Sequence, residues 1–95
     1  MSLLNRFRQK KTEGEAARVA RLLRTGRIAE GTILDINDDD QAAAQIFYSY
    51  NIGGMDYESS QLLSDAQHQQ KSNYAPGTRI IVRYDPRQPG NSVVV

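Results

Sequence analysis

The alternation of apolar and polar residues is clearest over residues 46–59, where two runs flank the pair Gly53-Gly54. Both runs are rich in aromatic and β-branched residues, and glycine reaches positive φ at both central turn positions without a steric cost. The pattern therefore predicts a β-hairpin with a two-residue turn, whose register is given by the pairs Ile52–Met55, Tyr50–Tyr57 and Tyr48–Ser59. One face of the hairpin then gathers the side chains expected in the core, which are Tyr48, Tyr50, Ile52, Met55 and Tyr57.

A helical period replaces the alternation over residues 13–24. Thr12 and Glu15 have the spacing of a capping box, in which each side chain bonds the backbone N–H of the other residue. Apolar residues then recur at the spacing of one helix face, namely Ala16, Val19, Ala20 and Leu23. Gly26 follows, and we expect it to adopt the left-handed conformation that ends many helices. This pattern predicts a helix that docks its apolar face on a sheet.

Alternation returns over residues 27–36 and 78–84, and a short apolar run occupies residues 92–95. The pattern leaves open which face of the strand at 27–36 is inward, whereas the strand at 78–84 has a defined inward face made by Ile80, Val82 and Tyr84. Residues 85–91 contain two prolines and predict a rigid turn, because proline fixes φ and lacks a ladder donor. We expect the final strand to begin only at Ser92.

Residues 64–73 are polar and lack a period, so they predict either a surface loop or a short helix capped by Ser64. The connections between strands are short and local, which favours antiparallel pairing over a parallel α/β sheet. The sequence therefore predicts a mainly β fold with one N-terminal α-helix. We expect a small antiparallel, partly open β-barrel or curled sheet of about five strands.

The chain of 95 residues has room for one domain, which we place at residues 12–95 after a basic flexible tail at 1–11. An alternative for the tail is a short anchor that inserts Leu3, Leu4 and Phe7 at an anionic membrane surface. No apolar run approaches the ~20 residues of a membrane-spanning helix, and residues 1–8 do not read as a secretory signal. We therefore expect a cytoplasmic location, with peripheral association with a membrane as the alternative.

Charge divides the chain into two parts. Residues 1–27 hold eight basic and two acidic side chains, whereas residues 28–95 hold four basic and nine acidic ones. The first part therefore carries +6 and the second −5, and the two parts should attract different partners or each other. The candidate binding surface is basic and consists of Arg18, Arg21, Arg24, Arg79 and Arg83. The alternative for the three helical arginines is a solvated helix face.

No motif predicts catalysis, a cofactor or a metal. The chain lacks cysteine, and His68 is its single histidine, which we expect to be exposed and without a functional partner. Asp35, Asn37 and Asp39 have the spacing of a calcium loop, but the two decisive positions of such a loop are occupied by Asp40 and Ile46. We expect no catalytic residue, no cofactor, no metal site and no enzyme activity.

The tyrosines allow two interpretations. Tyr48, Tyr50, Tyr57 and Tyr84 could stack the bases of a single-stranded nucleic acid, as aromatic residues do on small barrels. Such a platform needs positive charge nearby, and the hairpin instead carries Asp56 and Glu58. The sequence favours core packing, with the tyrosine hydroxyls reaching solvent at the rim of the sheet.

Four segments together resemble the family called domain of unknown function 3592. They are Leu23-x-x-Gly26, Gly31-Thr32-Ile33-Leu34, Tyr48-x-Tyr50-x-Ile52-x-Gly54-x-x-Tyr57, and Pro76-Gly77-x-x-x-x-Val82-x-Tyr84-Asp85-Pro86. The similarity covers about residues 22–95, and its motifs are mostly strand and turn markers. Members of that family often join this small β domain to transmembrane helices, and no common set of catalytic residues comes with the family. The resemblance implies a structural or interaction module more than an enzyme.

The sequence thus predicts an interaction module that binds a protein partner or docks at a membrane-associated complex. The alternative is a nucleic-acid-binding barrel that uses the basic segment with Arg79 and Arg83. A second expectation is self-association through the edge strand that ends in Val93-Val94-Val95.

Overall fold

The computed structural model describes residues 13–38 and 44–95. The expected tail at 1–11 and the expected capping residue Thr12 lie outside these residues. The elements are, in chain order, α2 (Glu15–Thr25), β1 (Arg27–Asn37), β2 (Gln45–Ile52), β3 (Met55–Leu62), α3 (Asp65–His68), the 3₁₀ helix η1 (Lys71–Tyr74), β4 (Arg79–Asp85) and β5 (Gln88–Val94).

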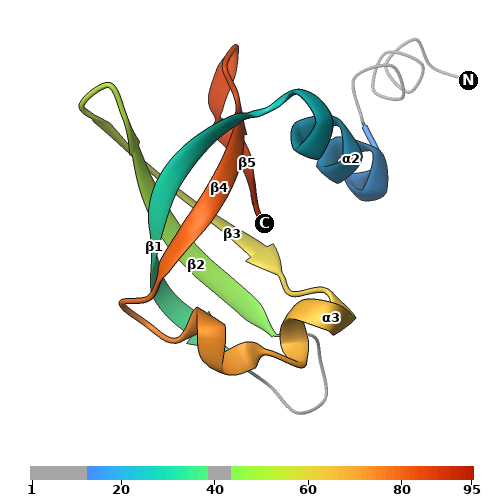
Figure 1. Cartoon of the computed structure of the whole chain (residues 1–95), viewed down its shortest axis with the longest axis vertical. Coiled ribbons are helices and arrows are strands. Elements are labelled where there is room, and N and C mark those ends of the chain that lie inside the picture. Colours follow the sequence, from blue (N-terminus) through green and yellow to red (C-terminus); the bar gives the residue numbers. More distant parts are fainter. Residues whose placement is uncertain (1–12, 39–43) are drawn as a thin grey trace, which may run out of the picture.

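The five strands form one antiparallel sheet in the order β3-β2-β1-β4-β5 (Figure 1). The sheet curls so that its two end strands, β3 and β5, approach each other. The result is a nearly closed, barrel-like sheet with one N-terminal helix, which confirms the predicted fold class. In Figure 1, α2 lies beside β4 and β5, and α3 lies near the far end of β3.

The hairpin of β2 and β3 has the predicted register, with Tyr50 opposite Tyr57 and Ile52 opposite Met55. Gly53 and Gly54 have φ values of 58° and 89°, as the two-residue turn requires. Met55 departs from the prediction, because its side chain is 60% exposed. It lies at the tip of the hairpin, where the strands extend beyond the core.

A β-bulge in β1 resolves which face of this strand is inward. Ile33 pairs with Tyr48 and Asp35 pairs with Phe47, so Leu34 is an extra residue without a partner on β2. Ile33 is buried before the bulge, and Ile36 packs against the core after it. Odd-numbered residues of β1 therefore point inward before the bulge, and even-numbered residues point inward after it.

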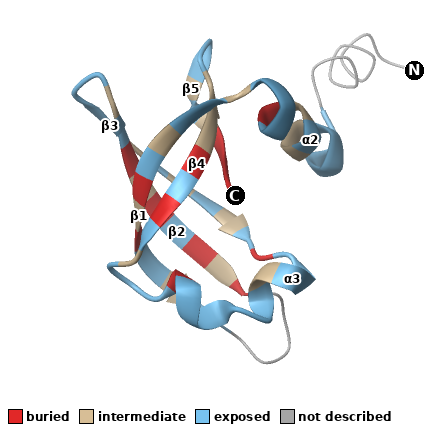
Figure 2. Ribbon diagram, viewed as in Figure 1, coloured by how far each residue is buried: buried red, intermediate tan, exposed pale blue. Residues whose placement is uncertain are grey.

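The tyrosines of the hairpin form part of the core rather than a stacking platform. Tyr48 and Tyr50 are 0% and 3% exposed, and buried and exposed positions alternate along β2 (Figure 2). The rings of Tyr50 and Tyr57 stack with centroids 5.6 Å apart. The prediction for the hydroxyls was wrong for two of them: Tyr48 Oη bonds Ser92 Oγ at 2.7 Å, and Tyr50 Oη donates to the Pro89 carbonyl at 2.5 Å. Both bonds link β2 to β5 across the interior.

Helix α2 docks through a different face from the one predicted. Its buried residue is Leu22, and Leu23 is 43% exposed. The helix begins at Glu15, two residues later than predicted, and its N-cap is Gly14, which has no side chain to cap it. The Glu15 carboxylate accepts bonds from Arg18. Leu22 lies outside the main core cluster, so α2 adds a second apolar layer on the outside of β4 and β5.

Gly26 has φ −70° and ψ 155°, so the prediction of a left-handed cap was wrong. The requirement for glycine is a close approach instead. A Cβ atom at this position would lie 2.5 Å from the carbonyl oxygen of Leu22 and 3.2 Å from that of Tyr84. The absence of a side chain lets the chain turn directly from α2 into β1 while touching β4.

Strand β5 begins at Gln88, four residues earlier than predicted. The turn is reduced to Pro86-Arg87, and Pro89 is tolerated because β5 is an end strand of the sheet. Val93 and Val94 are buried. The free edge of β5 is occupied by side chains: Gln61 Oε1 accepts from Val94 N–H, Gln67 Nε2 donates to Val94 O, and Arg18 Nη1 donates to Ser92 O. These bonds occupy backbone groups that an added strand would need.

The polar segment after β3 contains the short helix α3, as one of the two interpretations predicted. Ser64 caps it, with Ser64 Oγ accepting from Gln67 N–H and Gln67 Oε1 accepting from Ser64 N–H. Leu63, which precedes α3, and Tyr74, the last residue of η1, belong to the core cluster. This segment therefore contributes apolar side chains to one end of the sheet.

Candidate functional site

Arg18 and Arg21 of the predicted basic surface attach α2 to the β4–β5 region. Arg18 Nη1 donates to Asn91 Oδ1 at 2.8 Å and to the Ser92 carbonyl at 2.9 Å, while its other nitrogens bond Glu15. Arg21 lies between two carboxylates, with bonds to Glu13 at 2.9 Å and to Asp85 at 3.2 Å. Both side chains are about one-fifth to one-third exposed.

The other three arginines lie in separate environments. Arg83 Nη1 donates to the Gly26 carbonyl at 2.9 Å, which places it at the same junction as α2. Arg79 lies at the far end of β4, where it pairs with Glu30 at 3.1 Å on the exposed surface. Arg24 is exposed and makes no ion pair with another described residue. The structure thus brings Arg18, Arg21 and Arg83 to the helix–sheet junction and leaves Arg24 and Arg79 apart from it.

The carboxylates at this junction have lowered pKa values. The backbone N–H of Arg87, followed by the Arg21 guanidinium, holds the pKa of Asp85 below its usual value. Hydrogen bonds from Arg21 and Arg18 lower the pKa values of Glu13 and Glu15. A carboxylate with a lowered pKa in the folded state stabilises the fold above its unfolded pKa, and this contribution is lost as pH falls through the folded pKa.

We therefore expect the free energy of unfolding to fall as pH drops below about 4–5. Asp85→Asn should destabilise the protein at pH 7 and flatten the dependence on pH, because one of the carboxylates with a lowered pKa is absent. Urea unfolding between pH 3 and pH 7 measures this. Asp65→Asn is the matched control, since Asp65 is exposed and its carboxylate bonds no described residue. An equally steep acid loss in Asp85→Asn and wild type would contradict the expectation.

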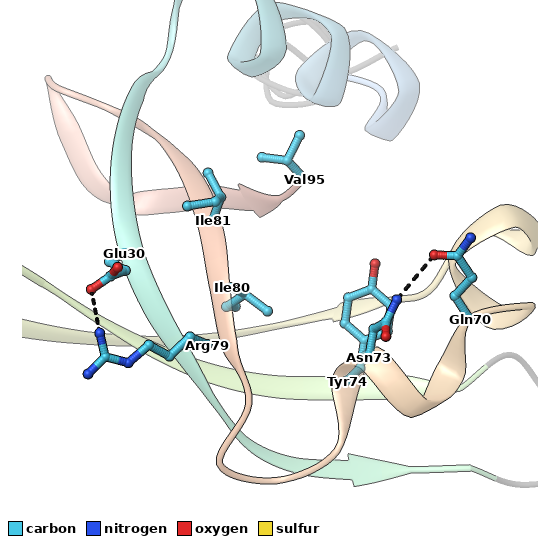
Figure 3. Close-up of a pocket in the computed structure, with 8 residues that line it drawn as sticks. All are labelled: Glu30, Gln70, Asn73, Tyr74, Arg79, Ile80, Ile81 and Val95. Carbon is cyan, nitrogen blue, oxygen red and sulfur yellow. Dashed lines mark hydrogen bonds and ion pairs between the residues drawn. The ribbon is translucent and has the colours of Figure 1, made fainter.

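Two hollows open on the surface and meet at Val95. The first, of about 370 Å³, has Ile80, Ile81 and Tyr74 in its wall and polar groups at its mouth (Figure 3). Figure 3 shows the Glu30–Arg79 pair on one side of this hollow and the bonded amides of Gln70 and Asn73 on the other. The hollow offers an apolar wall with polar groups around it, and no described residue in it has the partners of a nucleophile or of an acid–base pair.

The second hollow, of about 400 Å³, lies between α2 and the ends of β3 and β5. Val19 and Leu23 line it from the helix, Leu62 lines it from β3, and Glu15, Gln61, Ser64 and Gln67 supply its polar lining. The sequence had assigned Leu23 to the docking face of α2. The missed signal is the Leu22-Leu23 pair, because adjacent residues point about 100° apart on a helix and only one of the two leucines can point directly at the sheet.

We name the exposed apolar side chains around these hollows the Val95 surface: Leu23, Leu62, Ile81 and Val95. Their exposed fractions are 43%, 62%, 46% and 54%. They come from α2, β3, β4 and the residue after β5, so folding alone brings them together. An apolar surface with a polar rim can bury apolar groups of another molecule.

His68 has neighbours that the sequence did not predict. Its Nε2 lies 3.5 Å from Asp38 Oδ1, and the other oxygen of Asp38 bonds Lys71 Nζ. The hydrogen bond from Lys71, followed by that from His68, lowers the pKa of Asp38. These contacts join α3 and η1 to the end of β1. Among the residues that the structure describes, no three His, Cys, Asp or Glu side chains cluster as metal ligands.

Comparison with known proteins places the chain in a family. Within residues 13–38 and 44–95, no helix is both long enough and apolar enough to cross a membrane. A search of the curated proteins and a search of the solved structures each found no match. The family model described as domain of unknown function (DUF3592) matches residues 24–95, from the last turn of α2 through all five strands. The chain therefore belongs to the DUF3592 family.

Proposed function

We propose that this domain is a non-catalytic interaction module that binds a protein partner through the Val95 surface. The observation that supports the proposal is the convergence of four exposed apolar side chains from four parts of the chain around two adjoining hollows. Exposed apolar area concentrated in one place and rimmed by polar groups is typical of protein interaction sites. A partner that is a subunit of a membrane-associated complex would dock there in the same way.

The composition of the surface indicates the chemistry of the partner. The rim of the hollows combines the uncharged side chains of Gln61, Ser64, Gln67 and Asn73 with the charged side chains of Glu15, Glu30 and Arg79. Protein interfaces have this organisation of an apolar centre and a polar rim, with charged residues depleted from the centre. We expect the partner to present leucine-like or aromatic side chains to the hollows, with amide or hydroxyl groups around them.

Binding of nucleic acid has less support. Arg18, Arg21 and Arg79 are each paired with a carboxylate, so their charge is largely neutralised within the domain. Tyr48 and Tyr50 are buried and do not offer open rings to bases. Titration of a labelled single-stranded oligonucleotide at about 50 mM salt, where phosphate contacts are strongest, should show no binding. Salt-dependent binding in this assay would favour the nucleic-acid alternative.

The test of the proposal compares partners of wild-type and variant protein. The full chain, cross-linked in cells of the source organism, should capture a protein that Leu23→Asp and Val95→Asp both lose. Met55→Asp is the matched control, because Met55 is 60% exposed at the hairpin tip and lines neither hollow. With the purified partner, each Val95-surface variant should weaken binding at least ~10-fold, as replacement of a central contact does. Equal weakening by Met55→Asp, or none by the other two, would contradict the proposal.

A further inference from the structure

The outer face of β1, β2 and β3 forms a second surface, which carries negative charge. This face consists of the outward residues of β2 and β3 and those of β1 from Thr32 onward, which are exposed or half-buried. These residues include Asp35, Asp56 and Glu58 but no lysine or arginine. We name this surface the acidic sheet face. It is separate from the Val95 surface except at Leu62, which borders both.

The side chain of Phe47 lies in the middle of the acidic sheet face and is 37% exposed. On β1 its partner is Asp35, and on β3 its partner is Ser60, which places Glu58 diagonally beside it. Leu34, the bulge residue next to Asp35, is 45% exposed. An aromatic ring flanked by carboxylates suits a guanidinium group, which stacks on the ring while its N–H groups bond carboxylate oxygens.

The carboxylates of this face are open to such a ligand. Glu58 bonds no other described residue. Asp35 accepts the N–H of Ile36 with one carboxylate oxygen, and its second oxygen bonds no other described residue. Asp56 is bonded to Asn51, an uncharged neighbour. The face therefore keeps its negative charge, unlike the junction at α2, where arginines neutralise the carboxylates.

The chain itself contains a segment of complementary chemistry. Residues 1–11 hold Arg6, Arg8, Lys10 and Lys11, no carboxylate side chain, and the apolar residues Leu3, Leu4 and Phe7. Arg6 and Arg8 are two residues apart, so an extended chain would present both to the same side. We propose that the acidic sheet face binds the basic segment 1–11 of the same chain, with an arginine of the segment over Phe47.

The distances allow this contact within one chain. Glu15, in the first turn of α2, and Leu62, at the end of β3, line the same hollow. Ser60, the residue of β3 opposite Phe47, is two residues from Leu62, or about 7 Å along the strand. The six residues from Glu13 back to Phe7 span up to about 20 Å when extended. Covalent attachment also gives the segment a high effective concentration at the face.

A spin label tests the proposal in the full chain. Because the chain has no cysteine, Ser2→Cys provides a single labelling site. At about 20 mM salt, the label should reduce the amide NMR signals of Phe47 and Glu58 to less than half of their intensity with a diamagnetic label. At about 0.5 M salt the signals should recover, since screening weakens exposed ion pairs. Unreduced signals at low salt would overturn the proposal.

Variants and a mixing experiment separate the alternatives. Glu58→Lys and the more conservative Glu58→Gln should both restore most of the intensity, whereas Asp65→Lys, which changes an exposed carboxylate on α3, should not. Equal effects of the Glu58 and Asp65 variants would show that the segment responds to the overall charge of the domain and not to this face, and would overturn the proposal. A sample that mixes spin-labelled unenriched protein with unlabelled ¹⁵N-enriched protein should show no reduction. Reduction in that mixture would assign the segment to a second copy and overturn the intramolecular contact.

Discussion

Leu22→Ala is expected to lower the free energy of unfolding by about 2–4 kcal/mol. The Leu22 side chain is 0% exposed and is the buried residue of α2, so its removal leaves a cavity between the helix and the sheet. The same contact holds the helix beside β4 and β5, where its Val19 and Leu23 line the second hollow. Urea unfolding followed by far-UV circular dichroism measures the loss.

Leu23→Ala is the matched control, since it makes the same chemical change one residue later in the same helix. Leu23 is 43% exposed, and we expect a loss of no more than about 1 kcal/mol. The apolar period of the sequence predicts the opposite order, because it places Leu23 on the docking face. A larger loss for Leu23→Ala than for Leu22→Ala would show that α2 packs through that predicted face.

The apolar period mispredicts the docking face of α2, because Arg18 and Arg21 lie on the side of the helix that meets the sheet. A charged residue normally marks the outer face of an amphipathic helix. Here Arg18 and Arg21 extend toward the sheet and end on Ser92 O and Asp85, more than 60 residues away in sequence. Such partners cannot be read from the helix itself. The aliphatic part of each arginine covers apolar surface while its head group remains bonded at the edge.

The hairpin was predictable because its determinants are local. The turn residues Gly53-Gly54 fix the register, and the alternation on each side fixes the inward face. In β1 the same reasoning left the inward face open. The bulge at Leu34 shifts the phase of the strand, and no residue of β1 alone signals where that shift occurs. Pairing with β2 on one side and β4 on the other determines it.

Both surfaces depend on contacts between distant parts of the chain. The Val95 surface combines side chains from α2, β3, β4 and the end of the chain, and the acidic sheet face combines three strands. The division of charge was visible in the sequence, together with its implication that the two parts could attract each other. The position of the acidic part relative to Phe47 required the register of β1, β2 and β3.

The closure of the sheet by side chains was also hidden from the sequence. Gln61 and Gln67 bond the backbone of Val94, and the hydroxyls of Tyr48 and Tyr50 reach β5 from β2. These bonds occupy the edge that the sequence suggested for self-association through Val93–Val95. An edge strand whose backbone groups are already bonded is a poorer template for another strand.

The largest effect on stability is expected for Tyr48→Ala, at about 3–5 kcal/mol. Tyr48 is the largest of the fully buried side chains, and its ring stacks on Tyr50 with centroids 5.9 Å apart. Domains of this size have a total stability of roughly 5–15 kcal/mol, so this loss is a large fraction of the total and should shift the urea midpoint to a much lower concentration. Urea unfolding by circular dichroism tests this, with Phe47→Ala as the control on the outer face of the same strand.

Tyr48→Phe separates the ring from its hydroxyl. The ring stays in the core, but the Ser92 hydroxyl, in a residue that is 3% exposed, loses its partner, and we expect a loss of about 1–3 kcal/mol. Ser92→Ala combined with Tyr48→Phe should cost less than the sum of the two single changes, because neither side of the bond is then left unsatisfied. Strict additivity would show that the two hydroxyls do not depend on each other. If Phe47→Ala then destabilised the protein as much as Tyr48→Ala, the outer ring would belong to the core and could not serve as the centre of the acidic sheet face.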